Sequence, residues 1–331
     1  MLIINPNFAI DRTIPLEVMV PGAVHRTGSA TDSLGGKGVN VARVARAFGH
    51  PGVLVGFLPS ASASQLAKLA AREGAELAGV PIAGTVRAAS IFLERSGRAT
   101  VFNEPGPTVD ESDWSRLLGE VQRRAAGHQT VVCSGSLPPG SPVDAYARVV
   151  TVARSAGLRT VVDATGDVLA AALAAHPDVV SPNLAEAETL VFGPAIEGVE
   201  PKGDRVVQRA IEAAEGLVAR GAGHAIVSAG SHGAAVSAAA GALFWPAPEV
   251  TVVSPIGAGD SLVGGLVHAL EAGQTFTDAV QFALAVASAS CEQRIAGAVD
   301  VSRARELAAA LRTGPPVSML EPARETGPRT S

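Results

Sequence analysis

The chain has 331 residues, of which 47% are hydrophobic and 17% are charged, so it can bury a large core and is not a disordered protein. Its 26 basic and 31 acidic residues give a formal net charge of −5, which provides no excess of positive charge for nucleic acid or an anionic membrane. We therefore expect a small molecule as partner, with no nucleic acid and no membrane.

The two cysteines, Cys133 and Cys291, stand in apolar runs and are too few for a disulfide framework, which predicts buried free thiols. The first five residues lack a positively charged lead, and no uninterrupted apolar run approaches the roughly 18 residues that indicate a membrane helix. These features indicate a protein that stays in the reducing cytoplasm.

Short β-branched runs alternate along the chain with segments rich in alanine and leucine, which predicts an α/β fold with a mostly parallel sheet covered by helices. We expect strands at residues 2–4, 53–57, 130–133, 160–162, 179–180 and 225–227. We expect helices to begin near residues 38, 62, 112, 142, 184, 205, 258 and 277.

Two segments, residues 10–34 and 83–104, break this alternation because they lack helical periodicity and carry strand-like patterns. Together they predict a small sheet that projects from the main body as a lid. Residues 313–331 are rich in proline, glycine, arginine, threonine and serine, which predicts a flexible tail.

Glycines surround Lys37 in the run Gly35-Gly36-Lys37-Gly38, directly before a helical pattern. Glycine lets the backbone approach a ligand closely, and the lysine ammonium suits a phosphate or a sugar hydroxyl. The run also fits an ordinary glycine-rich loop with a solvated lysine. A Walker A motif occurs nowhere in the chain, which excludes the P-loop mode of nucleotide binding.

Polar loops follow three of the expected strands, and ligands of open α/β sheets bind beyond the carboxyl ends of strands. Ser136 lies in the first of these loops, and the second places Asn183 and Glu186 one helical turn apart. That pair fits a water-mediated Mg²⁺ site and equally a helix capping box. The third loop, residues 228–233, has small side chains that can admit the phosphates or ribose of a nucleotide.

Two charged residues accompany the lid segments. Asp11 stands where the first strand gives way to the lid, and its carboxylate can accept hydrogen bonds from vicinal sugar hydroxyls. Arg87 lies in the second lid segment, and its guanidinium can form a bidentate contact with a substrate phosphate. Each residue taken alone also fits a solvated surface charge.

The run Gly257-Ala258-Gly259-Asp260 opens a helical stretch. A glycine-rich helix start exposes backbone N–H groups and the positive end of the helix dipole, where an anion can bind. Asp260 is then placed to take a proton from a hydroxyl that attacks phosphorus. The same run also fits a tight turn with Asp260 as the helix N-cap.

Four motifs in order, at residues 35–40, 134–140, 182–186 and 257–261, resemble the successive signatures of the ribokinase-like (PfkB) sugar kinases. The resemblance covers residues 1–312 and implies one doubly wound, mostly parallel sheet flanked by helices, with a small β-sheet lid. The chain is most similar to the branch that acts on hexose monophosphates, which comprises 1-phosphofructokinase, tagatose-6-phosphate kinase and the minor 6-phosphofructokinase. Lys37 favours the first two, because the last has glycine there.

The resemblance also implies roles for individual residues. Asp260 would be the general base, and Gly257, Ala258 and Gly259 would form the anion hole. Glu186 would hold Mg²⁺ through water. The sugar phosphate would be bound by Asp11, Gly36, Lys37, Asn40, Arg87 and Ser136, and ATP by Asn183, Ser228, Gly230, Ser231 and Gly233.

The reaction implied is ATP- and Mg²⁺-dependent phosphorylation of a ketohexose monophosphate, first of all fructose 1-phosphate to fructose 1,6-bisphosphate. Tagatose-6-phosphate kinase and 6-phosphofructokinase are the alternatives within the family. A sugar-phosphate-binding regulator without turnover is the alternative from another class, because Ser181 stands where most of this branch has a lysine. Related proteins often pair through their lids, so a homodimer is expected.

Overall fold

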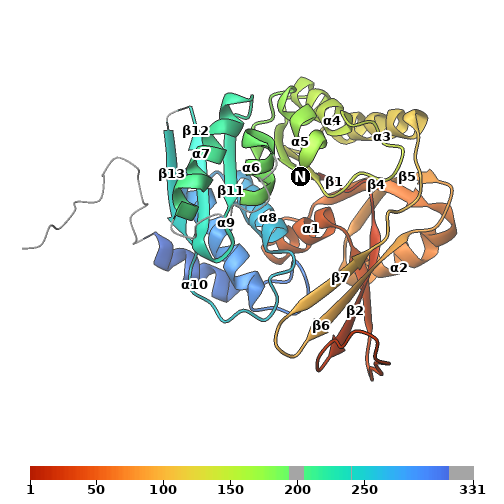
Figure 1. The fold of residues 1–331 in the computed structure, drawn as a ribbon. Coiled ribbons are helices and arrows are strands. Elements are labelled where there is room, and N and C mark those ends of the chain that lie inside the picture. The colour runs from red at the N-terminus through yellow and green to blue at the C-terminus, as the bar shows by residue number, and fades with distance from the viewer. Residues whose placement is uncertain (194–204, 240, 313–331) are drawn as a thin grey trace, which may run out of the picture.

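The computed structural model describes residues 1–193, 205–239 and 241–312. Its centre is a nine-stranded sheet with the order β13-β12-β11-β10-β9-β8-β1-β4-β5 (Figure 1). Neighbours from β5 to β11 pair in parallel, whereas β12 and β13 are antiparallel. The strands are β1 (Leu2–Ile4), β4 (Val53–Pro59), β5 (Glu76–Ile82), β8 (Thr130–Ser134), β9 (Arg159–Asp163), β10 (Val179–Val180), β11 (His224–Ser228), β12 (Gly233–Ala238) and β13 (Gly241–Pro246).

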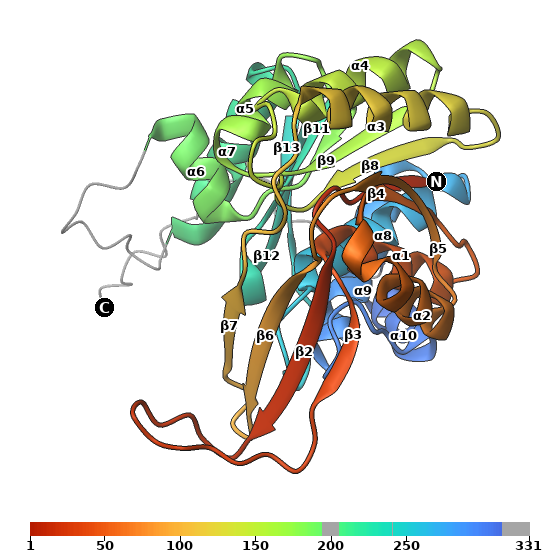
Figure 2. The ribbon, with the colours of Figure 1, turned by 90° about the vertical axis from the view of Figure 1, so that its right-hand side faces the viewer.

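Helices cover both faces of this sheet, which explains why its central strands are apolar on both sides. Figure 2 shows one layer of helices above the sheet and the other below it. The first layer contains α3 (Glu111–Arg124), α4 (Ala145–Ser155), α5 (Gly166–Leu173), α6 (Leu184–Phe192) and α7 (Val206–Ala219). The second contains α1 (Lys37–Ala47), α2 (Ala63–Glu73), α8 (Ala258–Glu271), α9 (Phe276–Cys291) and α10 (Val301–Leu311).

The alternating pattern of the sequence is confirmed. Every expected strand and helix is present, although the helix expected near residue 142 begins at Ala145. The sequence analysis missed β5, β12, β13, α5 and α10.

The expected lid is a separate four-stranded sheet with the order β3-β2-β6-β7, which projects from the main body in Figure 2. Its central pair, β2 and β6, is parallel, and both outer strands are antiparallel to their neighbours. The two expected segments therefore do pair with each other. The strands are β2 (Ala9–Leu16), β3 (Thr31–Gly35), β6 (Arg87–Glu94) and β7 (Ala99–Asn103).

Both cysteines are free, as expected, but they differ in burial. Cys133 is buried in β8, whereas Cys291 at the end of α9 is only half-buried, so the expectation of burial was wrong for Cys291. Within the described ranges, no helix is both long and apolar enough to cross a membrane. The tail expected at residues 313–331 lies outside the described residues.

Candidate active site

The start of α8 forms one wall of the site. Gly257 precedes the helix with φ 81°, a left-handed conformation that favours glycine, and a Cβ there would lie 2.9 Å from the Ala296 Cβ. Gly257 is therefore the N-cap, and the alternative that placed Asp260 there was wrong. The first N–H groups of a helix lack partners within it, and a Cβ on Gly259 would meet nothing within 4 Å. This helix start is open to an anion.

Asp260 lies in the first turn of α8 and is only 6% exposed. The Asn40 Nδ2 donates a hydrogen bond of 2.7 Å to the Asp260 Oδ2. Burial, followed by the negative charge of Asp163, raises the pKa of Asp260 to about 7, against the opposing effects of Lys37 and the Asn40 hydrogen bond. A carboxylate with a pKa near neutrality suits a general base, because a large fraction of it is ionised near pH 7 and the ionised form still binds a proton well.

Lys37 begins α1 and forms an ion pair with Asp163 at the end of β9, with Nζ–Oδ distances of 3.3 and 3.4 Å. The Ser134 hydroxyl also donates to Asp163, at 3.1 Å. Burial lowers the pKa of Lys37, but Asp163, Asp260 and Glu186 together raise it above its ordinary value. Lys37 therefore remains a cation among the negative charges of Asp163, Asp260 and Glu186.

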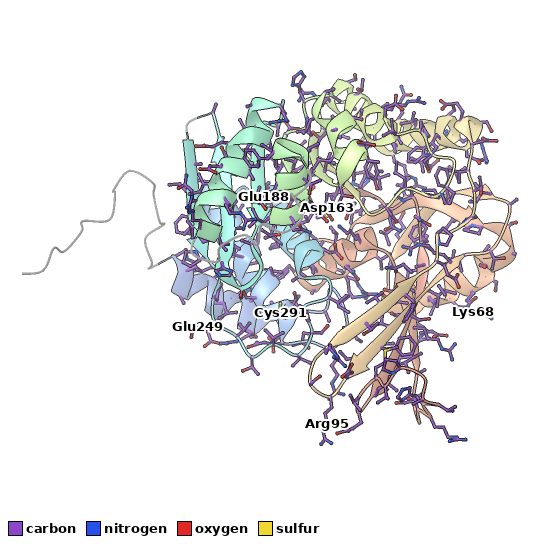
Figure 3. The ribbon with its side chains drawn as sticks, viewed as in Figure 1. Lys68, Arg95, Asp163, Glu188, Glu249 and Cys291 are labelled. Carbon is purple, nitrogen blue, oxygen red and sulfur yellow. The ribbon has the colours of Figure 1, made fainter. Side chains whose placement is uncertain are left out.

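The sequence analysis missed Asp163, which lies near the centre of the molecule in Figure 3. The signal was present, because Asp163 directly follows the strand expected at residues 160–162 and so stands at the carboxyl edge of the sheet. The same rule pointed to Ser136, in the loop after the neighbouring strand β8, and it applies equally to Asp163.

The glycine-rich loop before α1 is anchored to the end of β1. The Asn5 Oδ1 accepts a hydrogen bond of 3.0 Å from the Gly38 N–H. Gly36 has φ 122°, and a Cβ there would lie 2.6 Å from the Asn5 Oδ1. The Asn5 Nδ2 is buried and has no hydrogen-bond partner among the described residues. The loop thus needs glycine at position 36, and one buried donor beside it is left unsatisfied.

Asp11 and Arg87 lie on β2 and β6, the two strands of the lid sheet that pair in parallel. A Cβ on Gly35 would lie 2.0 Å from the Asp11 Oδ1, so the absence of a side chain makes room for this carboxylate. Burial raises the pKa of Asp11 to about 6, although the charges of Arg43 and Arg87 lower it. Burial also lowers the pKa of Arg87, whose Nε donates to the Asn7 carbonyl at 3.3 Å.

Ser136 and Asn7 complete this side of the site. The Asn7 Nδ2 donates to the Ser136 Oγ at 3.3 Å and to the Pro105 carbonyl at 3.1 Å. The Asn7 Oδ1 is buried without a partner in the described part of the chain. These contacts join the loop after β8 to the base of the lid. All six residues expected to bind the sugar phosphate therefore belong to one connected region: Asp11, Gly36, Lys37, Asn40, Arg87 and Ser136.

The residues expected to bind the nucleotide lie on two loops, which follow β10 and β11. Asn183 and Glu186 make the expected capping box at the start of α6, with two hydrogen bonds of 3.0 Å. A parallel β-bridge joins Asn183 to Ser228, so the two loops lie side by side. Gly230 and Ser231 are exposed on the same loop.

Gly233 is explained by the sheet. It is buried with φ 129°, and a Cβ there would lie 2.0 Å from the Trp245 carbonyl oxygen. Position 233 therefore requires glycine because the β13 backbone approaches it closely. This structural role does not depend on a ligand.

The described residues contain no group of three or more His, Cys, Asp or Glu side chains that could hold a metal ion. Mg²⁺ commonly keeps several waters and binds through one or two carboxylates together with substrate phosphates. Glu186 offers one such carboxylate, and its charge acts on Lys37. The donor set therefore fits a magnesium ion carried largely by water and nucleotide phosphate.

A lid, a helix start open to an anion, and a buried carboxylate beside a paired lysine define the kind of site that transfers a phosphoryl group to a small hydroxyl compound. Residues 6–302 match the model of the pfkB family carbohydrate kinases, and the chain belongs to this family.

Two relatives show the extent of the similarity. The chain is 32% identical over 284 residues to the 1-phosphofructokinase of Rhodobacter capsulatus, covering 85% of this chain and 87% of that protein. It is 27% identical over 308 residues to the tagatose-6-phosphate kinase of Staphylococcus epidermidis, covering 92% and 96%. The tetrameric inhibited form of phosphofructokinase-2 from Escherichia coli superimposes with a TM-score of 0.82 at 26% identity, covering 94% and 98%.

Proposed function

We propose that this kinase transfers the γ-phosphoryl group of ATP to a ketohexose monophosphate, with fructose 1-phosphate as acceptor and fructose 1,6-bisphosphate as product. The observation that carries the proposal is the buried Asp260 carboxylate, which lies on the first turn of a helix whose start is open to an anion. The 1-phosphofructokinase relative supports the choice of acceptor.

In this proposal, the C6 hydroxyl oxygen of the sugar attacks the γ-phosphorus while its proton passes to Asp260. The bond from the γ-phosphorus to the bridging oxygen breaks, and ADP leaves. The N–H groups at Gly257, Ala258 and Gly259 stabilise the charge that develops on the transferred group. Lys37 adds a positive charge, which Asp163 holds in place at 3.3 Å.

The sugar phosphate binds at the base of the lid. Asp11 accepts hydrogen bonds from the sugar hydroxyls, and Arg87 pairs with the phosphate that the substrate already carries. Gly36, Asn40 and Ser136 complete this side of the site. Closure of the lid over the sugar excludes water, which favours transfer to the sugar over hydrolysis of ATP.

ATP binds on the other side of Lys37. Asn183, Ser228, Gly230 and Ser231 line this region, with Gly233 fixing the turn behind it. Glu186 would hold Mg²⁺ through water, and a bound ion would supply positive charge at the nucleotide phosphates.

We further propose a homodimer that pairs through the lids, in a protein of the cytoplasm. Val24 near the lid tip is 81% exposed and Phe102 on β7 is 57% exposed. Exposed apolar side chains on this small sheet and on the connection between β2 and β3 favour association. The free thiols of both cysteines suit a reducing compartment.

A coupled ADP-release assay tests the acceptor. The assay compares fructose 1-phosphate, fructose 6-phosphate, tagatose 6-phosphate and the unphosphorylated sugars, and we expect the highest kcat/KM with fructose 1-phosphate. A higher value with tagatose 6-phosphate or fructose 6-phosphate would assign the enzyme to one of the alternatives. Binding of sugar phosphate without ADP release would favour the non-catalytic regulator suggested by Ser181.

A further inference from the structure

Arg43, in the middle of α1, is the centre of a hydrogen-bond network behind the site. Its Nε and Nη2 donate to the Glu73 Oε2 at 3.0 and 2.6 Å. Its Nη1 donates to the Asn40 Oδ1 at 2.8 Å and to the Ala296 carbonyl at 2.6 Å. Its Nη2 also donates to the Leu34 carbonyl at 2.9 Å. All three guanidinium nitrogens are thus engaged.

This network determines which way the Asn40 amide faces. An amide has one acceptor end and one donor end, a guanidinium only donates, and an ionised carboxylate only accepts. Because Arg43 donates to the Asn40 Oδ1, the Nδ2 must face the opposite partner, which is the Asp260 Oδ2 at 2.7 Å. A reversed amide would place two donors together and two acceptors together.

Glu73, at the end of α2, holds Arg43 in this orientation. Both side chains are mostly buried, with 21% and 18% exposure. The other carboxylate oxygen of Glu73 accepts a hydrogen bond of 2.7 Å from the Leu34 N–H, directly before the glycine-rich loop. Arg43 also reaches Ala296, which lies against the Gly257 turn. The pair therefore ties the loop before α1 to the segment beside the start of α8.

We propose that Arg43, held by Glu73, is a positioning residue for Asp260. It fixes the Asn40 amide so that one oxygen of the Asp260 carboxylate is held as a hydrogen-bond acceptor and the other is aimed at the attacking hydroxyl. This inference rests on the proposed function, because it concerns the residue that we propose as the general base.

A double-mutant cycle tests this proposal. We expect Arg43→Met to lower kcat by about tenfold, the size of one hydrogen bond to a charged group. We expect the double variant with Asn40→Ala to be no slower than Asn40→Ala alone, because Arg43 acts through Asn40. Arg46→Met, an exposed arginine on the same helix, is the matched control and should keep the kcat of the unchanged enzyme.

The pH profile of kcat gives a second readout that a merely structural role would not move. The Asn40 hydrogen bond lowers the pKa of Asp260, so its loss should shift the acidic limb of the profile to higher pH. The charged groups that act on Asp260 are Asp163 from β9, Lys37 from α1 and Asp11 from β2, and the variants leave all three in place.

The outcomes are distinct. Losses in kcat that multiply in the double variant, or an acidic limb that does not move, would overturn the role of Arg43. If Arg43→Met does not fold, Glu73→Gln replaces it in the same cycle with the same expectations. Near-normal turnover of Asp260→Asn would overturn the proposed function itself. An inactive Asp260→Asn together with an additive cycle would overturn only this inference.

Discussion

Replacing Asp260 with asparagine should abolish most turnover and yet stabilise the fold at alkaline pH. The substitution keeps the size of the side chain and an acceptor for the Asn40 amide while removing the base. We expect kcat to fall by roughly 10²–10⁴. The stability effect follows from burial, which destabilises the ionised carboxylate far more than a neutral side chain of the same size.

The sign and size of this effect follow from the pKa of Asp260, which is raised from an ordinary 3.8 to about 7. Between these values the native state binds a proton that the unfolded state has released, so stability falls as pH rises through this window. The full difference corresponds to about 4 kcal/mol above pH 7, as an upper limit. The ionisation of Asp260 is coupled to the charges of Lys37 and Asp163, so the effect of Asp260 alone is smaller than this limit. We therefore expect Asp260→Asn to raise the free energy of unfolding by about 1–3 kcal/mol at pH 8 and by little near pH 4.

Denaturant unfolding of both proteins at several pH values measures this gain. Asp167→Asn, an exposed carboxylate in the first turn of α5, is the matched control and should show no comparable dependence on pH. Equal stability of the Asp260→Asn variant and the unchanged protein across this pH range would refute the argument that burial of the ionised Asp260 carboxylate destabilises the fold.

Three further substitutions test the rest of the site. Arg87→Ala should raise the KM for sugar phosphate by roughly tenfold or more and leave the KM for ATP nearly unchanged, so equal effects on both would make Arg87 structural. Asp163→Asn removes a negative charge that raises the pKa of Asp260, so the acidic limb of the kcat profile should move to lower pH, and a shift to higher pH would contradict the assigned geometry. Ser181→Lys should increase the affinity for ATP by roughly five- to thirtyfold at saturating sugar phosphate, because it adds positive charge near the nucleotide phosphates. Titration of ATP at fixed Mg²⁺ measures this affinity. An unchanged affinity would show that the chain compensates elsewhere for the missing lysine.

Much of the fold was predictable because its signals are local. Apolar β-branched runs identified even the two-residue strand β10, since valines buried on both faces leave a clear pattern. The missed β12, at Gly233–Ala238, contains three alanines and one valine, and alanine has low strand propensity. The missed α5 is apolar around most of its circumference, so it shows no helical period to detect.

The site was predictable where one motif carries the chemistry and less so where two distant segments share it. The glycines around Lys37 and before Asp260 form local motifs that can be recognised in the sequence. The contacts of Asn40 with Asp260 and of Arg43 with Glu73 join residues 220 and 30 positions apart, and no local pattern specifies such pairs. Asn40 was expected at the sugar, and the structure adds that its amide donates a hydrogen bond to Asp260.

The most direct test of the account follows the acceptor itself by ³¹P NMR in the presence of ATP and Mg²⁺. With fructose 1-phosphate we predict a second phosphate ester signal at C6 that grows in step with ADP, and no such signal with Asp260→Asn. Release of inorganic phosphate from ATP without a new ester, or equal ester formation by both proteins, would contradict the claim that this site transfers phosphate to the sugar through Asp260.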